Sequence, residues 1–149
     1  MEKLNFDNGL KRFRINGDAV LEFNPSDTNV YARFLEAAEK IAKVENDLVA
    51  RGEKIDINDG QAVIRLMAEA DTEVKKLLRY VFGEQNDFNK IFGGVNVMAV
   101  ASNGERVITN FLNAISPIIM DGAKSYAKAK AAGVAGEVKQ NRAQRRANR

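Results

Sequence analysis

Three amino acids are absent from the sequence: none of its 149 residues is His, Cys or Trp. Without Cys the chain can form no disulfide, no thiolate nucleophile and no Cys-based zinc site. Without His it has no imidazole base near neutral pH and no Ser-His-Asp triad. The chemistry that remains is that of carboxylates, lysines or a hard cation bound by oxygen atoms.

Nucleotide and metal motifs are also missing. The sequence contains neither a Gly-x-x-x-x-Gly-Lys phosphate loop nor a Gly-x-Gly-x-x-Gly fingerprint. Residues 56–60 (Asp-Ile-Asn-Asp-Gly) resemble a calcium loop, but alignment on Gly60 puts Ile55, Ile57 and Leu66 at three positions that must supply ligands. This segment is better interpreted as a loop followed by a helix N-cap. We therefore expect no metal and no cofactor.

The acidic residues Glu69, Asp71 and Glu73 offer several carboxylates close together in the sequence. Residues two apart on a helix do not face each other, and Lys75, Lys76 and Arg79 follow directly. A solvated helix face with local ion pairs explains this pattern better than a general acid and base. The sequence therefore predicts that the protein is not an enzyme.

Charge is divided unevenly along the chain. Residues 1–123 hold 15 Lys and Arg against 19 Asp and Glu, whereas residues 124–149 hold 8 Lys and Arg against a single acid. The modest net charge of +3 is thus the sum of a mildly acidic body and a strongly basic tail.

Long apolar runs are lacking as well. The longest segments without charge, residues 91–104 and 107–120, are 14 residues each, shorter than the roughly 18 that a membrane-spanning helix needs. Residues 1–7 do not have the apolar stretch of a secretory signal. We expect a protein that is not in a membrane and stays in the cytoplasm.

Residues 1–24 alternate between apolar and polar side chains, which is typical of strands. Two Asn-Gly pairs, Asn8-Gly9 and Asn16-Gly17, favour tight hairpin turns. The pattern predicts an antiparallel β-meander of two or three short strands, with Leu4 and Phe6 in the first of them. A sheet of this size must pack on another element to be stable.

Helical periodicity dominates residues 25–123. We expect long amphipathic helices at residues 28–51, capped by Ser26 or Asp27, and at residues 60–82, paired as an antiparallel hairpin. A shorter helix is predicted at residues 85–92, and residues 95–100 form either a buried extended segment or a turn.

A last apolar helix follows Asn103-Gly104, with a kink or break near Ser116 because Pro117 removes one helical hydrogen bond. Residues 124–149 are predicted to be helical near Tyr126 and disordered at their end. The fold class is therefore α+β, in which the meander (1–24) and a mainly α-helical bundle (25–123) form one domain that carries a basic tail.

Two features are candidates for binding a partner. The first is the apolar stripe of the last helix, for which burial in the core is the alternative. The second is the basic tail, which can dock on an acidic protein, bind nucleic acid through phosphates, or only raise solubility. The tail has no aromatic residue after Tyr126 and the body is acidic, so nucleic acid is the least favoured partner. The candidate residues are Phe111, Ile115, Ile118, Ile119, Met120, Lys139, Arg142, Arg145, Arg146 and Arg149.

Several segments resemble a group of small proteins encoded in the tail-morphogenesis modules of phages and prophages of Gram-positive bacteria. The resembling segments are Ile15–Gly17, Phe23–Asp27, Phe82–Glu84, Ile91–Gly94 and Phe111–Ile119, followed by the basic end. Together they span the chain from about residue 13 to its last residue. Such proteins are tail assembly chaperones, which keep the long helical tape measure protein soluble and help to recruit tail-tube subunits.

The resemblance implies a non-enzymatic chaperone in the cytoplasm of the bacterial host, with the tape measure protein and the tail-tube subunit as partners. It implies no catalytic residue. Self-association into a homo-oligomer is a further candidate interaction. Two alternatives remain open, namely a structural tail or connector component and a nucleic-acid-binding accessory protein that uses the tail arginines.

Overall fold

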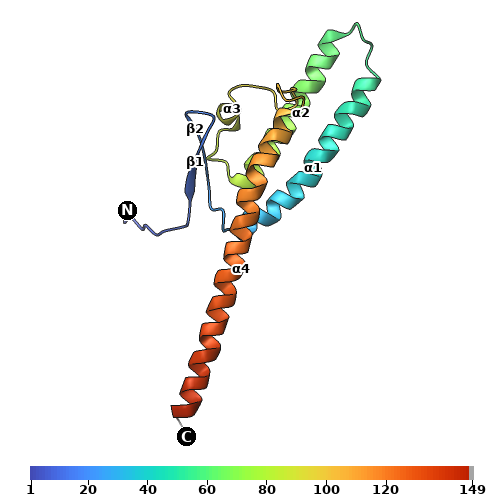
Figure 1. The fold of residues 1–149 in the computed structure, drawn as a ribbon. Helices are drawn as coiled ribbons and strands as arrows, with labels where there is room; N and C mark the ends of the chain where they lie inside the picture. The colour runs from blue at the N-terminus through green and yellow to red at the C-terminus, as the bar shows by residue number, and fades with distance from the viewer. Residues whose placement is uncertain (148–149) are drawn as a thin grey trace.

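The structure is a computed structural model that describes the backbone of residues 1–147 and the side chains of residues 1–130 and of Arg146. It confirms the α+β class, because a two-stranded antiparallel sheet at the N-terminus packs on helices (Figure 1). The elements are β1 (Lys11–Ile15), β2 (Ala19–Phe23), α1 (Thr28–Glu53), α2 (Gly60–Phe82), α3 (Phe88–Ile91) and α4 (Val107–Ala147).

The sheet is a single hairpin of two strands, the smaller of the two predicted sizes, and the prediction of a strand around Leu4 and Phe6 is wrong. Strand β1 pairs with β2 in an antiparallel register that places Phe13 opposite Leu21. Asn16 and Gly17 in the connecting turn have φ angles of 46° and 115°, which explains the Asn-Gly pair there. Leu4 and Phe6 are 87% and 78% exposed and lie in an extended arm before β1.

Local hydrogen bonds explain why the arm does not fold back as a strand. The side chains of Asp7 and Asn8 accept hydrogen bonds from the backbone N–H groups of Gly9 and Leu10. The amide of Asn24, just after β2, donates to the carbonyl oxygen of Asn8 at 3.1 Å. These contacts fix residues 8–9 at the foot of the hairpin, where the arm leaves the body.

Helices α1 and α2 form the predicted antiparallel pair (Figure 1). Asp27 and Asp59 cap their N-termini by accepting hydrogen bonds from the backbone N–H groups of Asn29 and Ala62. Helix α2 has the predicted bounds. Helix α1 extends two residues beyond its predicted end at Arg51, because Gly52 continues the helix instead of ending it.

The segment between α2 and α4 holds the shortest helix and a loop. Helix α3 begins only at Phe88, later than predicted, because Asp87 caps it by accepting a hydrogen bond from the N–H of Lys90. Of the two structures considered for residues 95–100, the turn is observed, ending in an isolated bridge between Val100 and Arg106. Val97 and Met98 within this loop are buried in the core.

Helix α4 continues through Pro117. The helix break near Ser116, which was one of the two predicted outcomes, is therefore not observed. Ile115 and Ile119 on either side of Pro117 are only 4% and 1% exposed. Their burial offsets the loss of the hydrogen bond that proline removes.

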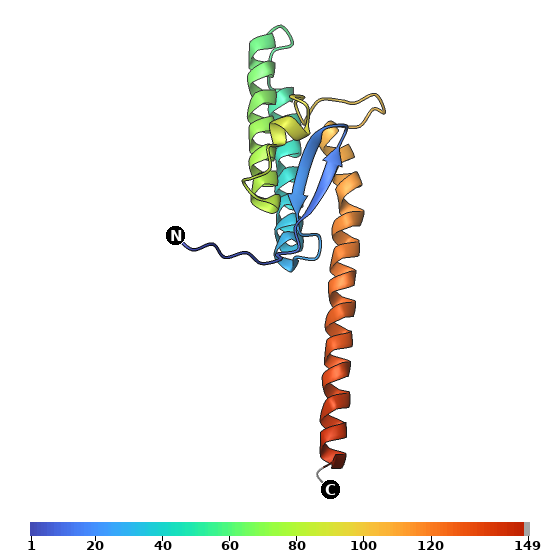
Figure 2. The same ribbon diagram turned by 90° about the vertical axis from the view of Figure 1, so that its left-hand side faces the viewer.

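Beyond the body, α4 projects as a helix as far as Ala147 (Figure 2), further than the helix predicted near Tyr126. Alanine and lysine, which are frequent there, favour helix. The predicted disordered chain end stays a prediction for residues 148–149, which lie outside the described residues.

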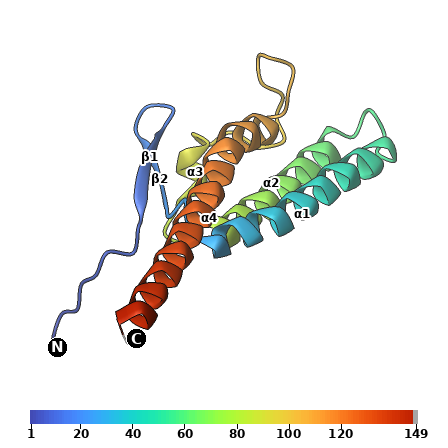
Figure 3. The same ribbon diagram turned by 60° about the horizontal axis from the view of Figure 1, so that its bottom comes forward.

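A cluster of phenylalanine rings connects the hairpin to the helices. The ring of Phe82 lies 5.0 Å from that of Phe23, 6.1 Å from that of Phe88 and 6.2 Å from that of Phe111, measured between centroids. Phe13 stacks on Phe23 at 5.1 Å. The same core includes buried residues of β2 and of all four helices. The hairpin and the first half of α4 therefore lie side by side against the α1–α2 pair (Figures 2 and 3).

The buried side chain of Asn86 attaches the hairpin to the end of α2. Its amide oxygen accepts a hydrogen bond from the N–H of Glu22 at 2.8 Å. Its amide nitrogen donates to the carbonyl oxygens of Glu22 at 3.0 Å and Phe82 at 2.9 Å. Asn86 thus covers the outer edge of β2 in the way that a neighbouring strand would.

We expect the substitution Asn86→Ala to lower the free energy of unfolding by about 1–3 kcal/mol, because buried backbone groups of Glu22 lose their partners. Chemical denaturation measures this loss, and faster hydrogen exchange at the Glu22 amide locates it. Asn58→Ala is the control, since Asn58 is exposed in the α1–α2 loop. Equal stability of the two variants would contradict the role assigned to Asn86.

Gly122 marks a close approach between α4 and the corner after β2. A Cβ atom at this position would overlap the carbonyl oxygen of Pro25. Gly122→Ala should therefore lower the free energy of unfolding by about 1–3 kcal/mol through overpacking. Gly52→Ala is the matched control within a helix: a Cβ there meets no atom within 4 Å, and we expect it to stabilise the protein by about 0.5–1 kcal/mol. A stabilising Gly122→Ala substitution would show that the two segments do not touch.

Candidate protein-binding cleft

The predicted apolar partner residues of α4 do not form one exposed surface. Ile115 and Ile119 belong to the buried core, and Phe111 and Ile118 are half-buried. Met120 is 43% exposed, but it does not line the same hollow as Phe111. The helix therefore divides the predicted stripe into a core face and a flank that remains accessible at Phe111 and Ile118.

Of the predicted basic residues, Arg146 is exposed on the projecting part of α4. Lys139, Arg142 and Arg145 lie on the same helix, but their side chains are outside the described residues. Arg149 lies outside the described part of the chain altogether. These residues lie on the projecting part of α4 (Figure 2), whereas the cleft described next is lined by the first turns of the same helix.

An apolar cleft of about 450 Å³ lies between β1 and the first turns of α4. Its volume falls within the range of about 300–1,000 Å³ that is typical of ligand pockets. The aromatic cluster positions both walls, since Phe13 on β1 and Phe111 on α4 are members of the connected rings. The residues that line it are Phe13, Arg14, Ile15, Asn16, Ile91, Phe92, Ala101, Val107, Asn110, Phe111, Ala114, Ile115 and Ile118.

The backbone edge of β1 borders this cleft. Strand β1 pairs with β2 on one side only, and among the described residues no other group forms a hydrogen bond with the backbone of residues 11–15. The outer edge of β2, in contrast, is covered by Asn86. The cleft thus combines an apolar floor with an unpaired strand edge, the arrangement that binds extended peptides by strand addition.

The polar groups at the cleft lie at its rim. Arg14 and Asn16 come from the hairpin, and the side chain of Asn110 exchanges hydrogen bonds of 2.8 and 3.2 Å with Asn103. An apolar floor with a polar rim suits the burial of apolar side chains from a protein partner.

Sequence reasoning missed the half of the cleft that comes from β1 and α3. Alternation did place Phe13 and Ile15 in a strand, and helical spacing placed Phe111 and Ile118 on the apolar stripe of a helix. Neither pattern says which strand lies beside which helix. The contact between the two walls is a tertiary feature that requires the structure.

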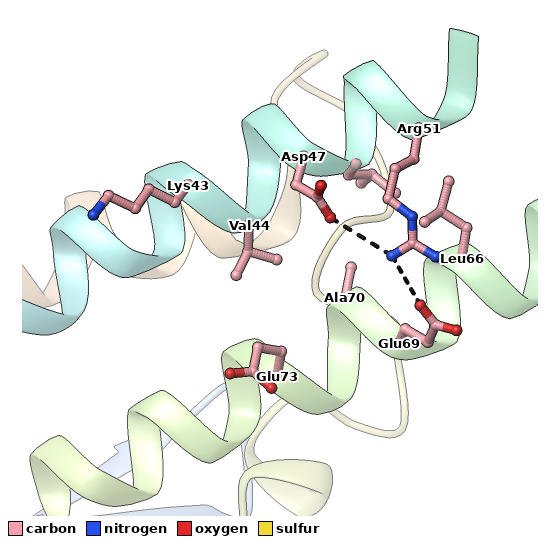
Figure 4. Close-up of a pocket in the computed structure, with 9 residues that line it drawn as sticks. Lys43, Val44, Asp47, Arg51, Leu66, Glu69, Ala70 and Glu73 are labelled. Atoms are coloured by element: carbon pink, nitrogen blue, oxygen red, sulfur yellow. Dashed lines mark ion pairs between the residues drawn. The ribbon is translucent and has the colours of Figure 1, made fainter. Parts of the chain in front are cut away.

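A second hollow, of about 320 Å³, lies between α1 and α2 and is lined by charged residues (Figure 4). Arg51 reaches across it, with its guanidinium 3.6 Å from the carboxylate of Asp47 and 3.0 Å from that of Glu69. Leu48, Leu66 and Ala70 contribute apolar lining. Because these ions are half-exposed, each pair contributes little to stability. The groove therefore gives a weaker case for a site than the apolar cleft.

The carboxylates that the sequence placed on a solvated face have different surroundings. Glu69 is exposed, as predicted, and pairs with Arg51 of α1, a partner that the sequence did not indicate. Asp71, in contrast, is largely buried: it accepts hydrogen bonds from the buried Lys75 ammonium at 3.0 Å and from the Val97 N–H at 2.8 Å. Asp71 thus attaches the loop after α3 to α2. Within the described residues, no three acidic side chains lie close enough together to hold a metal ion.

Glu36 and Lys40 on α1, away from the cleft, have shifted pKa values. The hydrogen bond from Lys40, at 3.0 Å, lowers the pKa of the Glu36 carboxyl, and the hydroxyl of Tyr80 adds to this effect. The same bond raises the pKa of Lys40. Both groups lie in solvent and outside the cleft, so they do not alter its apolar character.

No protein-family model, curated protein or solved structure shows significant similarity to this chain. Among the helices of the described residues, none combines the length and the apolar character that crossing a membrane requires.

We expect Ala114→Arg to reduce the binding of a fluorescent apolar dye to the folded protein severalfold, because Ala114 is exposed and lines the cleft. The melting temperature should stay close to that of the unchanged protein, since exposed substitutions usually alter stability by no more than about 0.5 kcal/mol. Asn113→Arg is the control, because Asn113 is the neighbouring exposed residue of α4 and does not line the cleft. Equal dye binding by both variants would show that the dye does not enter this cleft.

Proposed function

We propose that this protein is a non-enzymatic phage tail assembly chaperone that binds segments of the tape measure protein and keeps them soluble until the tail tube forms. The observation that carries this proposal is the apolar cleft between β1 and α4, whose α4 wall includes four residues of the segment Phe111–Ile119. That segment is one of those on which the resemblance to tail assembly chaperones rests.

The physical task of such a chaperone fits a cleft of this kind. A tape measure protein is a very long, largely helical chain that exposes apolar side chains before it is enclosed by the tail tube. Phe111 and Ile118 are half-buried, so they can contact a partner without being removed from the core. Release at tail assembly requires only that the tube competes for the same apolar surface.

The projecting part of α4 adds an electrostatic component to this proposal. Residues 124–149 carry a net charge of +7, and those as far as Ala147 lie on a helix that stands away from an acidic body. Such a charge distribution speeds encounters with acidic partner segments and makes them sensitive to salt. We assign the tail-tube subunit as a second partner, and the cytoplasm of the bacterial host as the place of action, on the basis of the resemblance.

Co-expression with the tape measure protein encoded beside this chain tests the proposal. We expect the unchanged protein and Asn113→Arg to keep the tape measure protein soluble and to co-purify with it. Ala114→Arg should lose most of its binding to the tape measure protein, because the arginine side chain occupies the cleft and places a charge in its apolar lining. Binding at increasing salt concentration then reports the contribution of the basic helix.

A tape measure protein that stays insoluble beside the unchanged chaperone would contradict the proposed function. If Ala114→Arg keeps as much tape measure protein soluble as the unchanged protein does, the proposed function holds but the cleft is not the binding site. Stable incorporation of the chain into purified phage particles would favour a structural tail component instead.

A further inference from the structure

The N-terminal arm, residues 1–7, presents apolar side chains that its own body does not cover. Leu4 and Phe6 are both highly exposed, and in an extended chain residues two apart point to the same side. Large apolar side chains held together in water in this way typically mark an interaction site. The arm therefore offers two apolar side chains of an extended segment to a partner.

The arm does not reach the cleft of its own chain in this structure. Asn24 holds Asn8 at the foot of the hairpin, and Gly9 adopts a φ of 74° directly against the Asn24 side chain. From this point the arm leaves the body at the end of the hairpin opposite its turn (Figures 1 and 3). In Figure 2 it runs to the side away from α4, whereas the cleft lies between β1 and α4.

We infer that the arm of one chain occupies the cleft of a second copy, adding a strand to the free edge of β1 and inserting Leu4 and Phe6 between β1 and α4. The edge offers unpaired backbone groups, and the cleft offers an apolar floor. Seven extended residues span about 23 Å, which exceeds the length of the five-residue strand β1.

The two segments differ in charge. Strand β1 carries Lys11, Arg12 and Arg14 and no acidic residue, whereas the arm carries the two acidic residues Glu2 and Asp7 against one basic residue, Lys3. Reciprocal exchange of arms makes the same surface of both copies contact its counterpart, which closes a dimer. The arm occupies the same cleft that the proposed function assigns to the tape measure protein, so the two compete for it. The inference does not rest on the proposed function, since the purified protein alone tests it.

The absence of Cys from the chain permits a direct cross-linking test. One preparation carries Phe6→Cys and another carries Ala114→Cys, and the two are mixed and oxidised. We expect a disulfide between chains, because the arm of the first lies in the cleft of the second. Ile57→Cys mixed with Ala114→Cys is the control, since Ile57 is equally exposed but lies in the α1–α2 loop.

Sedimentation velocity supplies an independent measurement. Deletion of residues 1–7, or the single change Phe6→Asp, should raise the dimer dissociation constant by at least about tenfold, because apolar burial at the cleft is lost. Ile57→Asp should leave it unchanged. The arm-deleted protein should still bind the tape measure protein, so failure of the inference and failure of the proposed function give different results.

Three outcomes would overturn the inference. The first is a chain that stays monomeric at every concentration tested. The second is a dimer that survives deletion of the arm. The third is a disulfide that forms within a single chain carrying both Phe6→Cys and Ala114→Cys, which would place the arm in its own cleft.

Discussion

The contact of Phe82 with rings from three other elements is the constraint on which this fold depends. Phe23, Phe88 and Phe111 all lie against it, and Phe13 and Phe92 extend the cluster outward to β1 and to the end of α3. A two-stranded hairpin has too little buried surface to be stable alone. Its position, and therefore the distance between β1 and α4, is set by these aromatic contacts. The cleft is the space that the cluster leaves between the two.

Single polar side chains hold in place the irregular segments that the aromatic cluster does not fix. Asn86 pairs with the backbone of Glu22, Asp71 with that of Val97, and Arg106 with the carbonyl oxygen of Met98 at 2.8 Å. The first two fix a segment without regular structure to the hairpin and to α2, and Arg106 joins two parts of the loop before α4. Within the described residues, no buried side-chain nitrogen or oxygen lacks a hydrogen-bond partner. The irregular segment between α2 and α4 is therefore specified as closely as the helices are.

Local features of the structure could be predicted from the sequence, and long-range contacts could not. Capping residues and apolar periodicity gave α1 and α2 to within two residues, since both signals act within one element. The arm was wrongly predicted as a strand because alternation of Leu4 and Phe6 does not reveal that Asn24 holds the chain at Asn8. The apolar stripe of α4 was recognised, but its division between core and cleft depends on where the hairpin packs. Asp71 and Asn86 gave no sequence signal, because their partners are backbone groups distant in the chain.

Helix α4 has a mechanical consequence that follows from its continuity. One helix forms a wall of the cleft, packs against Pro25 at Gly122 and then leaves the body. A helix is stiff over this length, so a load applied to its projecting end acts on the cleft as torque about the contact at Pro25. Phe111 joins α4 to the same aromatic cluster that holds the hairpin. A load on the projecting end would therefore reach both the cleft and this cluster through one continuous helix.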